Sequence, residues 1–243
     1  MSTRTPLLTE LIDAHPEAAA TLDPLVEAAR LDEPVSVGPR TAGPCVHPYA
    51  WLVEHVGPDG LRLTESGYLP PRSVAAAARE FDLARRWHGS LQREDVALPV
   101  LALRETALRL GLLRRRGTVL RRSAPAAAAL GDPVAMWRLV AAGLPFRYGR
   151  RAHRGHAGVL LLLAVAGDSD SPYRDVVAGL TALGWTVRGH PSVTTGMAVD
   201  LCVDTADVLA WTGSVRGSDL LGTLRSTPPG VLLARAALGA PVA

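Results

Sequence analysis

PVLALRETALRLGLLRRRGTVLRRSAPAAAAL, residues 99–130, carries the clearest structural pattern in this chain. Leu101, Leu108 and Leu112 recur at helical spacing, which predicts a helix over 99–113 with one apolar stripe. A run of arginines follows directly, and Gly117 favours a tight turn between two short strands. A helix followed by a basic two-stranded hairpin is the outline of a winged helix, a three-helix relative of the helix-turn-helix.

The same plan recurs elsewhere in the chain. Residues 61–67, 119–125 and 223–230 each combine an apolar strand with a hydroxyl residue and then Gly or Pro. The hydroxyl residues Thr64, Ser123 and Thr227 are the predicted N-caps of the helices that follow. Aromatic residues make up only 5% of the chain, so the core must be mostly Leu, Val and Ala, which suits helix packing. The sequence therefore predicts a mainly α fold with small β-wings, built from tandem winged-helix-like units.

Turn-forming residues and charge divide the chain into four expected segments. We expect an acidic helical N-terminal segment with a Pro- and Gly-rich connector over 1–44, and a first winged-helix-like unit over 45–144. A basic linker over 145–156 carries His153 and His156 as solvated residues, and a second winged-helix-like unit spans 157–243. Two short helices are expected in the second unit, at 192–198 and 205–211.

Charge is concentrated in one part of the sequence. All 26 basic residues are arginine, which resembles the coding bias of a high-GC genome and weakens any argument from arginine as a chosen residue type. Residues 1–60 hold three arginines against nine acids, whereas residues 101–154 hold twelve arginines against Glu105 and Asp132. The net charge of +3 hides this asymmetry, which points to an acidic partner for the basic segment.

DNA is the partner that this basic segment fits best. In a winged helix the helix before the wing enters the major groove, and the wing contacts phosphates or the minor groove. Arginine bonds guanine edges and neutralises phosphates. The candidate nucleic-acid-binding residues are Arg104, Arg109, Arg114, Arg115, Arg116, Arg121, Arg122, Arg147, Arg150, Arg151 and Arg154.

The alternative is a protein-interaction scaffold without nucleic-acid contact. Winged helices often bind proteins, and the second unit carries Asp200, Asp204 and Asp207 before its wing, which disfavours DNA reading there. That unit is expected to contact a protein partner or the first unit. A scaffold of this kind predicts an exposed apolar patch, at Trp185 or Trp211.

An enzyme is not expected, because no catalytic constellation is found. The chain has no Gly-rich loop ending in Gly-Lys and no Gly-x-Ser-x-Gly elbow. The pairs Cys45/His47 and His153/His156 supply too few ligands for a structural zinc site, so neither a metal nor a cofactor is expected. The start of the chain does not resemble a signal peptide, and the apolar run 157–166 is about half a bilayer span. A cytoplasmic protein that does not enter the membrane is the resulting expectation.

Four motifs also resemble a known group of proteins. They are Trp51 with Leu61-x-Leu-Thr-x-x-Gly-Tyr-Leu-Pro-Pro71, Pro99-Val-x-x-Leu-Arg with Leu110-Gly-Leu-Leu-Arg114, Asp132-Pro-Val-x-x-Trp137, and Thr227-Pro-x-Gly-x-x-Leu-Ala-Arg-Ala-Ala-Leu238. Together they are similar to actinobacterial proteins described as insertion-element passenger or plasmid open-reading-frame proteins. The resemblance covers about residues 45–240 and implies a cytoplasmic location and the fold, including a winged-helix-like C-terminal region. It implies no catalytic residue, because these motifs are structural.

Overall fold

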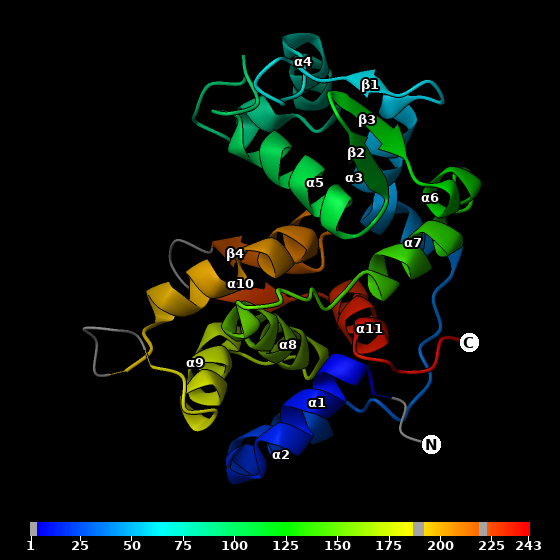
Figure 1. Ribbon diagram of the computed structural model, residues 1–243. Coiled ribbons are helices and arrows are strands. Elements are labelled where there is room, and N and C mark those ends of the chain that lie inside the picture. The colour runs from blue at the N-terminus through cyan, green and yellow to red at the C-terminus, as the bar shows by residue number, and fades with distance from the viewer. Residues whose placement is uncertain (1–3, 187–191, 219–222) are drawn as a thin grey trace. The chain divides into compact units, whose positions relative to one another are not determined.

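The computed structural model describes residues 4–186, 192–218 and 223–243, and it forms two compact units. The central unit is Val46–Val140, and the terminal unit combines Met1–Cys45 with Ala141–Ala243. Both are mainly helical with a small antiparallel sheet, so the predicted fold class is confirmed at that level (Figure 1). The N-terminal segment, which was expected as a segment of its own over 1–44, belongs to the same unit as Ala141–Ala243.

The central unit surrounds a three-stranded antiparallel sheet with strand order β1-β3-β2. The predicted helix and basic hairpin are both present, but the helix ends at Arg109 because Leu113 already begins a strand. In chain order the elements are α3 (Pro39–Val56), β1 (Leu61–Arg62), α4 (Pro71–Glu80), η2 (Leu83–Arg85), α5 (Leu98–Arg109), β2 (Leu113–Arg116), β3 (Val119–Arg122), α6 (Ala124–Ala128) and α7 (Pro133–Ala142). The boundaries of the unit fall inside α3, after Cys45, and inside α7, after Val140.

The core of the central unit lies between α3, α5 and the sheet. Leu120 of β3 is fully buried and pairs with Leu61 of β1. On α5 the buried face includes Leu103, and the Thr106 hydroxyl contacts the Tyr49 hydroxyl at 2.9 Å. A satisfied polar pair of this kind fixes the register of α5 against α3.

The terminal unit is built around α8, which is buried along 157–166. Helices α9, α10 and α11 pack against it, and α1 and α2 also contact it (Figure 1). The elements are α1 (Pro6–Ala14), η1 (Pro16–Ala18), α2 (Ala19–Ala28), α8 (Ala152–Ala166), α9 (Pro172–Ala182), α10 (Thr195–Trp211), β4 (Val215–Ser218), β5 (Thr223–Ser226) and α11 (Pro228–Ala237).

Three helices are longer than the sequence predicted. α3 begins at Pro39, inside the expected connector, and α8 begins at Ala152, inside the expected linker. α10 is one helix rather than two. Its middle packs on α8, where the Cys202 thiol donates to the Ala157 carbonyl at 3.4 Å and Thr205 lies against Gly158. This tertiary packing holds residues 199–204 in a helix that local propensity did not indicate.

Two of the three predicted hydroxyl caps are confirmed. The Ser123 hydroxyl accepts from the Ala126 amide at 3.3 Å, and the Thr227 hydroxyl accepts from the Gly230 amide at 3.2 Å. The prediction for Thr64 was wrong. Its hydroxyl accepts from the Tyr68 amide within a turn, and α4 begins only at Pro71.

Candidate nucleic-acid interface

The two units contain the same local structure around their hairpins. In each, a glycine with left-handed backbone angles ends a helix, and the amide of the next residue donates to a carbonyl of that helix. The carbonyl of this next residue accepts from the amide of the residue that caps the helix after the hairpin. These positions are Ala107, Gly111, Leu112 and Ser123 in the central unit, and Leu209, Gly213, Ser214 and Thr227 in the terminal unit. The two hairpins can therefore be compared residue by residue.

Two arginines lie directly opposite each other in each hairpin, and the pair occupies the equivalent position in both. In the central unit Arg114 pairs with Arg121, and in the terminal unit Arg216 pairs with Arg225. Directly opposite side chains in an antiparallel pair have Cβ atoms about 5 Å apart, and like charges there destabilise the pair. In both hairpins a nearby negative charge would therefore reduce the repulsion between the two arginines.

The terminal hairpin receives that charge from within its own unit. A carboxylate oxygen of Asp170, in the loop between α8 and α9, accepts from the Arg225 guanidinium at 2.7 Å. The neighbouring Asp168 accepts from the Ser226 hydroxyl on the same strand. This exposed ion pair offsets part of the repulsion between the two arginines.

The central hairpin has an arginine beside it instead. The segment between the first two helices of this unit forms β1, which pairs with β3 and sets Arg62 opposite Val119. Arg116 is also opposite Val119, from the other side. Because residues opposite each other share one face of a sheet and successive residues alternate, Arg62 and Arg116 lie on the same face as Arg114 and Arg121.

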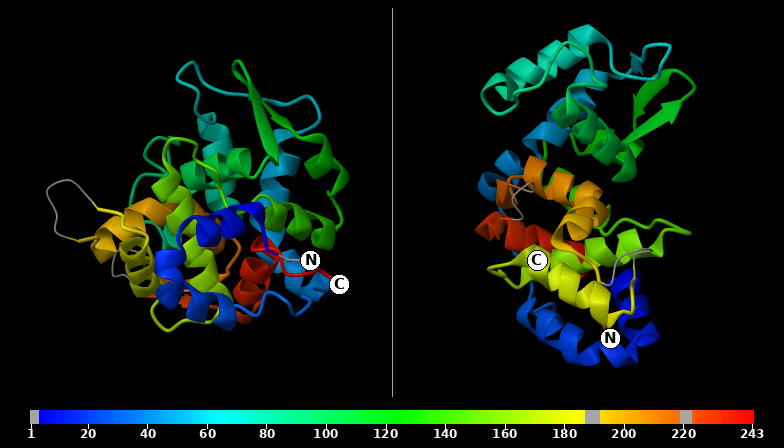
Figure 2. Two further views of the ribbon diagram at one scale, coloured as in Figure 1. Left: turned by 60° about the horizontal axis from the view of Figure 1, so that its bottom comes forward. Right: turned by 90° about the vertical axis from the view of Figure 1, so that its left-hand side faces the viewer.

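We call these four side chains, Arg62, Arg114, Arg116 and Arg121, the arginine face. All four are exposed, whereas the other face of the sheet is buried through Leu61, Leu113 and Leu120. The hairpin that carries three of them protrudes from the helices of the central unit (Figure 2, green strands). Among the described residues, none of the four guanidinium groups forms an ion pair with a carboxylate.

This arrangement can bind a polyanion. Along a strand, side chains on one face repeat about every 7 Å, and neighbouring strands lie about 5 Å apart. Two unit charges 7 Å apart in water repel by about 0.6 kcal/mol. A row of phosphates placed against the arginine face would replace these repulsions by attraction and by charge-assisted hydrogen bonds.

Arg62 was missed by the sequence analysis. It lies about 50 residues before the hairpin, and only the pairing of β1 with β3 brings it there. The alternation Leu61-Arg62-Leu63 carried a usable signal, since it marks Arg62 as the outward residue of a half-buried strand.

Arg104 is removed from the candidate set by its burial. Its Nε donates to Glu94 at 2.7 Å and an Nη contacts Glu105 at 2.9 Å, with only 4% of the Arg104 side chain exposed. Glu94 has no exposed surface, and burial raises the pKa of its carboxyl although Arg104 opposes that shift. The prediction that Arg104 contacts nucleic acid was wrong, because its guanidinium is the counter-ion of a buried carboxylate.

Two hairpin arginines also make contacts inside the central unit. Arg122 donates to the carbonyls of Val53 and Glu54, at 2.7 and 2.8 Å, and so caps the C-terminus of α3. Arg115 donates to the Gly117 carbonyl at 2.9 Å and lies over the backbone of Gly67. Both point to the face of the sheet opposite the arginine face, so they hold the hairpin in place.

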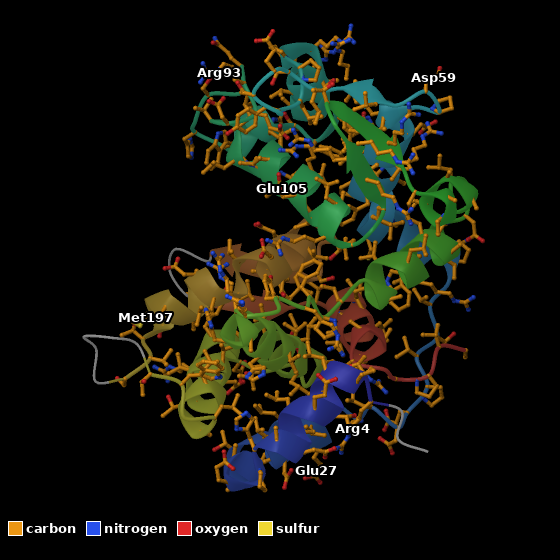
Figure 3. The ribbon with its side chains drawn as sticks, viewed as in Figure 1. Arg4, Glu27, Asp59, Arg93, Glu105 and Met197 are labelled. Atoms are coloured by element: carbon orange, nitrogen blue, oxygen red, sulfur yellow. The ribbon has the colours of Figure 1, made fainter. Side chains whose placement is uncertain are left out.

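The outward side of α5 is mostly apolar. The residues at helical spacing that face away from the buried stripe are Leu98, Leu101, Ala102, Glu105, Leu108 and Arg109. Glu105 is labelled in Figure 3. Only Arg109 in this set could hydrogen-bond a guanine edge or a phosphate. One such side chain is too few for α5 to recognise a sequence of bases in a major groove.

The remaining candidates belong to the terminal unit, so the expected continuous 101–154 face is divided between two units. Arg147 contacts Glu10 of α1 at 3.3 Å. Arg150 and Arg151 are exposed just before α8, and Arg154 is half-buried in its first turn.

Comparison with protein-family models, curated proteins and solved structures found no match for this chain. No helix among the described residues has the length and apolar character needed to cross a membrane. Within the same residues, no three His, Cys, Asp or Glu side chains gather as metal ligands would.

Proposed function

We propose that this protein is a non-enzymatic binding module that contacts duplex DNA through the arginine face of its central unit. The observation that carries the proposal is the difference between the two hairpins. The Arg216–Arg225 pair has Asp170 as an internal counter-ion, whereas the Arg114–Arg121 pair has Arg62 at its side. An external polyanion supplies the charge that the second arrangement lacks.

The order of elements supports a winged-helix architecture for the central unit. Helix, strand, two helices and a hairpin follow one another, and the first strand pairs with the outgoing strand of the hairpin. β2 and β3 are then the wing, an element that contacts phosphates and positions a protein on a duplex. The repeated helix–glycine–hairpin–cap structure supports a second winged-helix-like unit that contains α8–α11.

The proposed binding is to the backbone rather than to base edges. α5 would be the groove-entering helix of a winged helix, but its outward side is mostly apolar and Arg104 is engaged with Glu94. Phosphate contacts alone carry no direct sequence information. We therefore expect weak sequence preference.

Salt dependence follows from the number of phosphates neutralised. With four contacts, the logarithm of the binding constant should fall with the logarithm of salt concentration with a slope of about −3.6. Between 50 and 200 mM salt this corresponds to roughly a 150-fold loss of affinity. Dissociation constants near the micromolar range are expected at the lower concentration.

The test is a fluorescence-anisotropy titration of a labelled random-sequence duplex with the full chain. Arg114, Arg116 and Arg121 changed together to Ala should reduce the slope to about −0.9, since one contact remains. The matched control changes Arg72, Arg79 and Arg86 to Ala, which removes the same charge from exposed positions outside the sheet. Equal losses of DNA affinity and salt slope in both triple variants would show that only the net charge of the protein matters, and would overturn the proposal. No wild-type binding at 50 mM salt would instead favour a protein-interaction role.

A further inference from the structure

A pocket of about 400 Å³ opens on the terminal unit, far along the chain from the arginine face. Its lining includes His153 from α8, Trp185 after α9, Val193 before α10, and Met197, Asp200 and Leu201 from the first turns of α10. Met197 is labelled in Figure 3. Pockets of about 300–1,000 Å³ with mainly apolar walls and a few polar groups are typical small-molecule sites.

The walls of this pocket leave apolar surface uncovered. Val193 is buried, but Trp185, Met197 and Leu201 are only partly buried although each is large and hydrophobic. Burying their remaining surface against a ligand would be favourable by about 25 cal/mol for each Å² removed from water. The flexible thioether of Met197 can adapt its shape to such a ligand.

Trp185 is held rigidly at this pocket. Its indole nitrogen donates to Nδ1 of His156 at 3.1 Å. The rings of His153 and His156 both contact it edge-on, with centroids 5.5 and 5.6 Å away. The hydrogen bond requires an unprotonated Nδ1, and burial lowers the pKa of His156, which keeps the ring neutral. The aromatic ring is therefore pre-organised before any ligand arrives.

Of the described residues that line the pocket, only Asp200 is charged when His153 is neutral. Asp200 is exposed at its edge, and none of the described residues forms an ion pair with it. Burial lowers the pKa of His153, and Arg154 and Arg151 lower it further, so the imidazole stays neutral near pH 7. A carboxylate and a tryptophan ring that line one pocket can both attract a cation, because the ring face adds a cation–π contribution to the charge of the carboxylate.

We propose that this pocket binds a small organic cation, an ammonium group attached to an apolar or aromatic body. The ammonium group is paired with Asp200 and lies near the Trp185 ring, while the apolar body fills the space bounded by Val193, Met197 and Leu201. This site is separate from the proposed DNA contacts and does not depend on them.

The test uses three probes of one shape and different charge: 2-phenylethylamine, 2-phenylethanol and phenylacetate. Full-length protein labelled with ¹⁵N in its tryptophan side chains reports binding through the indole N–H signals, and Trp185→Phe assigns the signal of Trp185. We expect 2-phenylethylamine to shift that signal and to bind at least tenfold more tightly than 2-phenylethanol, with no binding of phenylacetate.

Asp200→Asn should abolish the preference for the amine while retaining the weak binding of the alcohol. Asp23→Asn, at an exposed acid of α2 in the same unit, is the matched control and should change nothing. Equal affinity for amine and alcohol in the wild type, an unmoved Trp185 signal, or an unaltered preference in Asp200→Asn would each overturn the proposal.

Discussion

Replacing Arg104 by Met tests the buried ion pair that joins α5 to the loop before it. Glu94 is fully buried and accepts from the Leu69 amide at 2.6 Å and from Arg104 at 2.7 Å. The methionine side chain would fill much of the volume but would leave the carboxylate with the single backbone donor. Removing one partner of a buried pair costs about 3–5 kcal/mol, and we expect about 3 because Glu94 can take up a proton. That corresponds to a fall of roughly 12–24 °C in the melting temperature of the central unit.

Calorimetry of the full chain would measure this loss, and hydrogen exchange followed by mass spectrometry would locate it in residues 98–109. Arg93→Met is the matched control, since Arg93 is 68% exposed and its partner Asp95 lies at the surface. Its melting should be unchanged. Arg104→Met combined with Glu94→Gln should recover part of the loss, because no buried charge remains. If Arg104→Met melted like the control, the structural role assigned to Arg104 would be refuted.

The same variant has a distinctive pH dependence. Burial already raises the pKa of Glu94, and loss of Arg104 should raise it further. A carboxyl whose folded pKa lies above its unfolded value contributes stability at low pH and loses it as the pH rises through the folded pKa. Acidification from pH 7.5 to 5 should therefore stabilise Arg104→Met relative to the double variant that also carries Glu94→Gln. An unchanged difference between the two variants would contradict this reasoning.

Three further predictions concern the terminal unit. Thr227→Ala removes the N-cap of α11 and should cost about 1 kcal/mol in a urea titration, and a change within error would argue against the cap. Acidification from pH 7.5 to 5 should lower the melting temperature, because the folded pKa values of His153 and His156 lie below that of the unfolded chain. The unfolded state then binds protons first, so stability is full above about pH 7 and declines below it, and a constant melting temperature would be contrary evidence. Asp170→Ala removes the carboxylate partner of Arg225, and because the proposed contacts all lie on the central unit, the salt slope of DNA binding should stay near about −3.6, whereas a steeper slope would show that the terminal hairpin also contacts DNA.

Local signals predicted the parts of the fold that depend on neighbouring residues. The hairpin around Gly117 forms as expected. Asp132, directly before Pro133, is an N-cap by the same local rule, since its carboxylate accepts from the amides of Val134 and Ala135 at 3.0 Å. Turn residues and caps act within a few positions, so their effect can be recognised without knowledge of tertiary contacts. Ser123 and Thr227 belong to the same class.

Features decided by tertiary contacts could not be predicted in this way. The burial of Arg104 depends on Glu94, ten residues away, and in an arginine-rich sequence nothing distinguishes this arginine from its exposed neighbours. The single helix α10 depends on its packing against α8. Arg62 joins the candidate site only through strand pairing, which a sequence pattern does not fix between distant segments.

The most direct test of the central claim changes Arg62, the residue that distinguishes the two hairpins. Arg62→Asp places a carboxylate beside β3, as Asp170 lies beside β5 in the terminal unit. The salt slope of DNA binding should become shallower, from about −3.6 in the wild type to about −2.7 in Arg62→Ala, where one contact is lost. In Arg62→Asp the slope should become shallower still, about −1.8, because the new carboxylate also forms an ion pair with a neighbouring arginine. Arg72→Asp, on α4, should keep the wild-type slope, and an Arg62→Asp slope equal to that of the wild type would contradict the account.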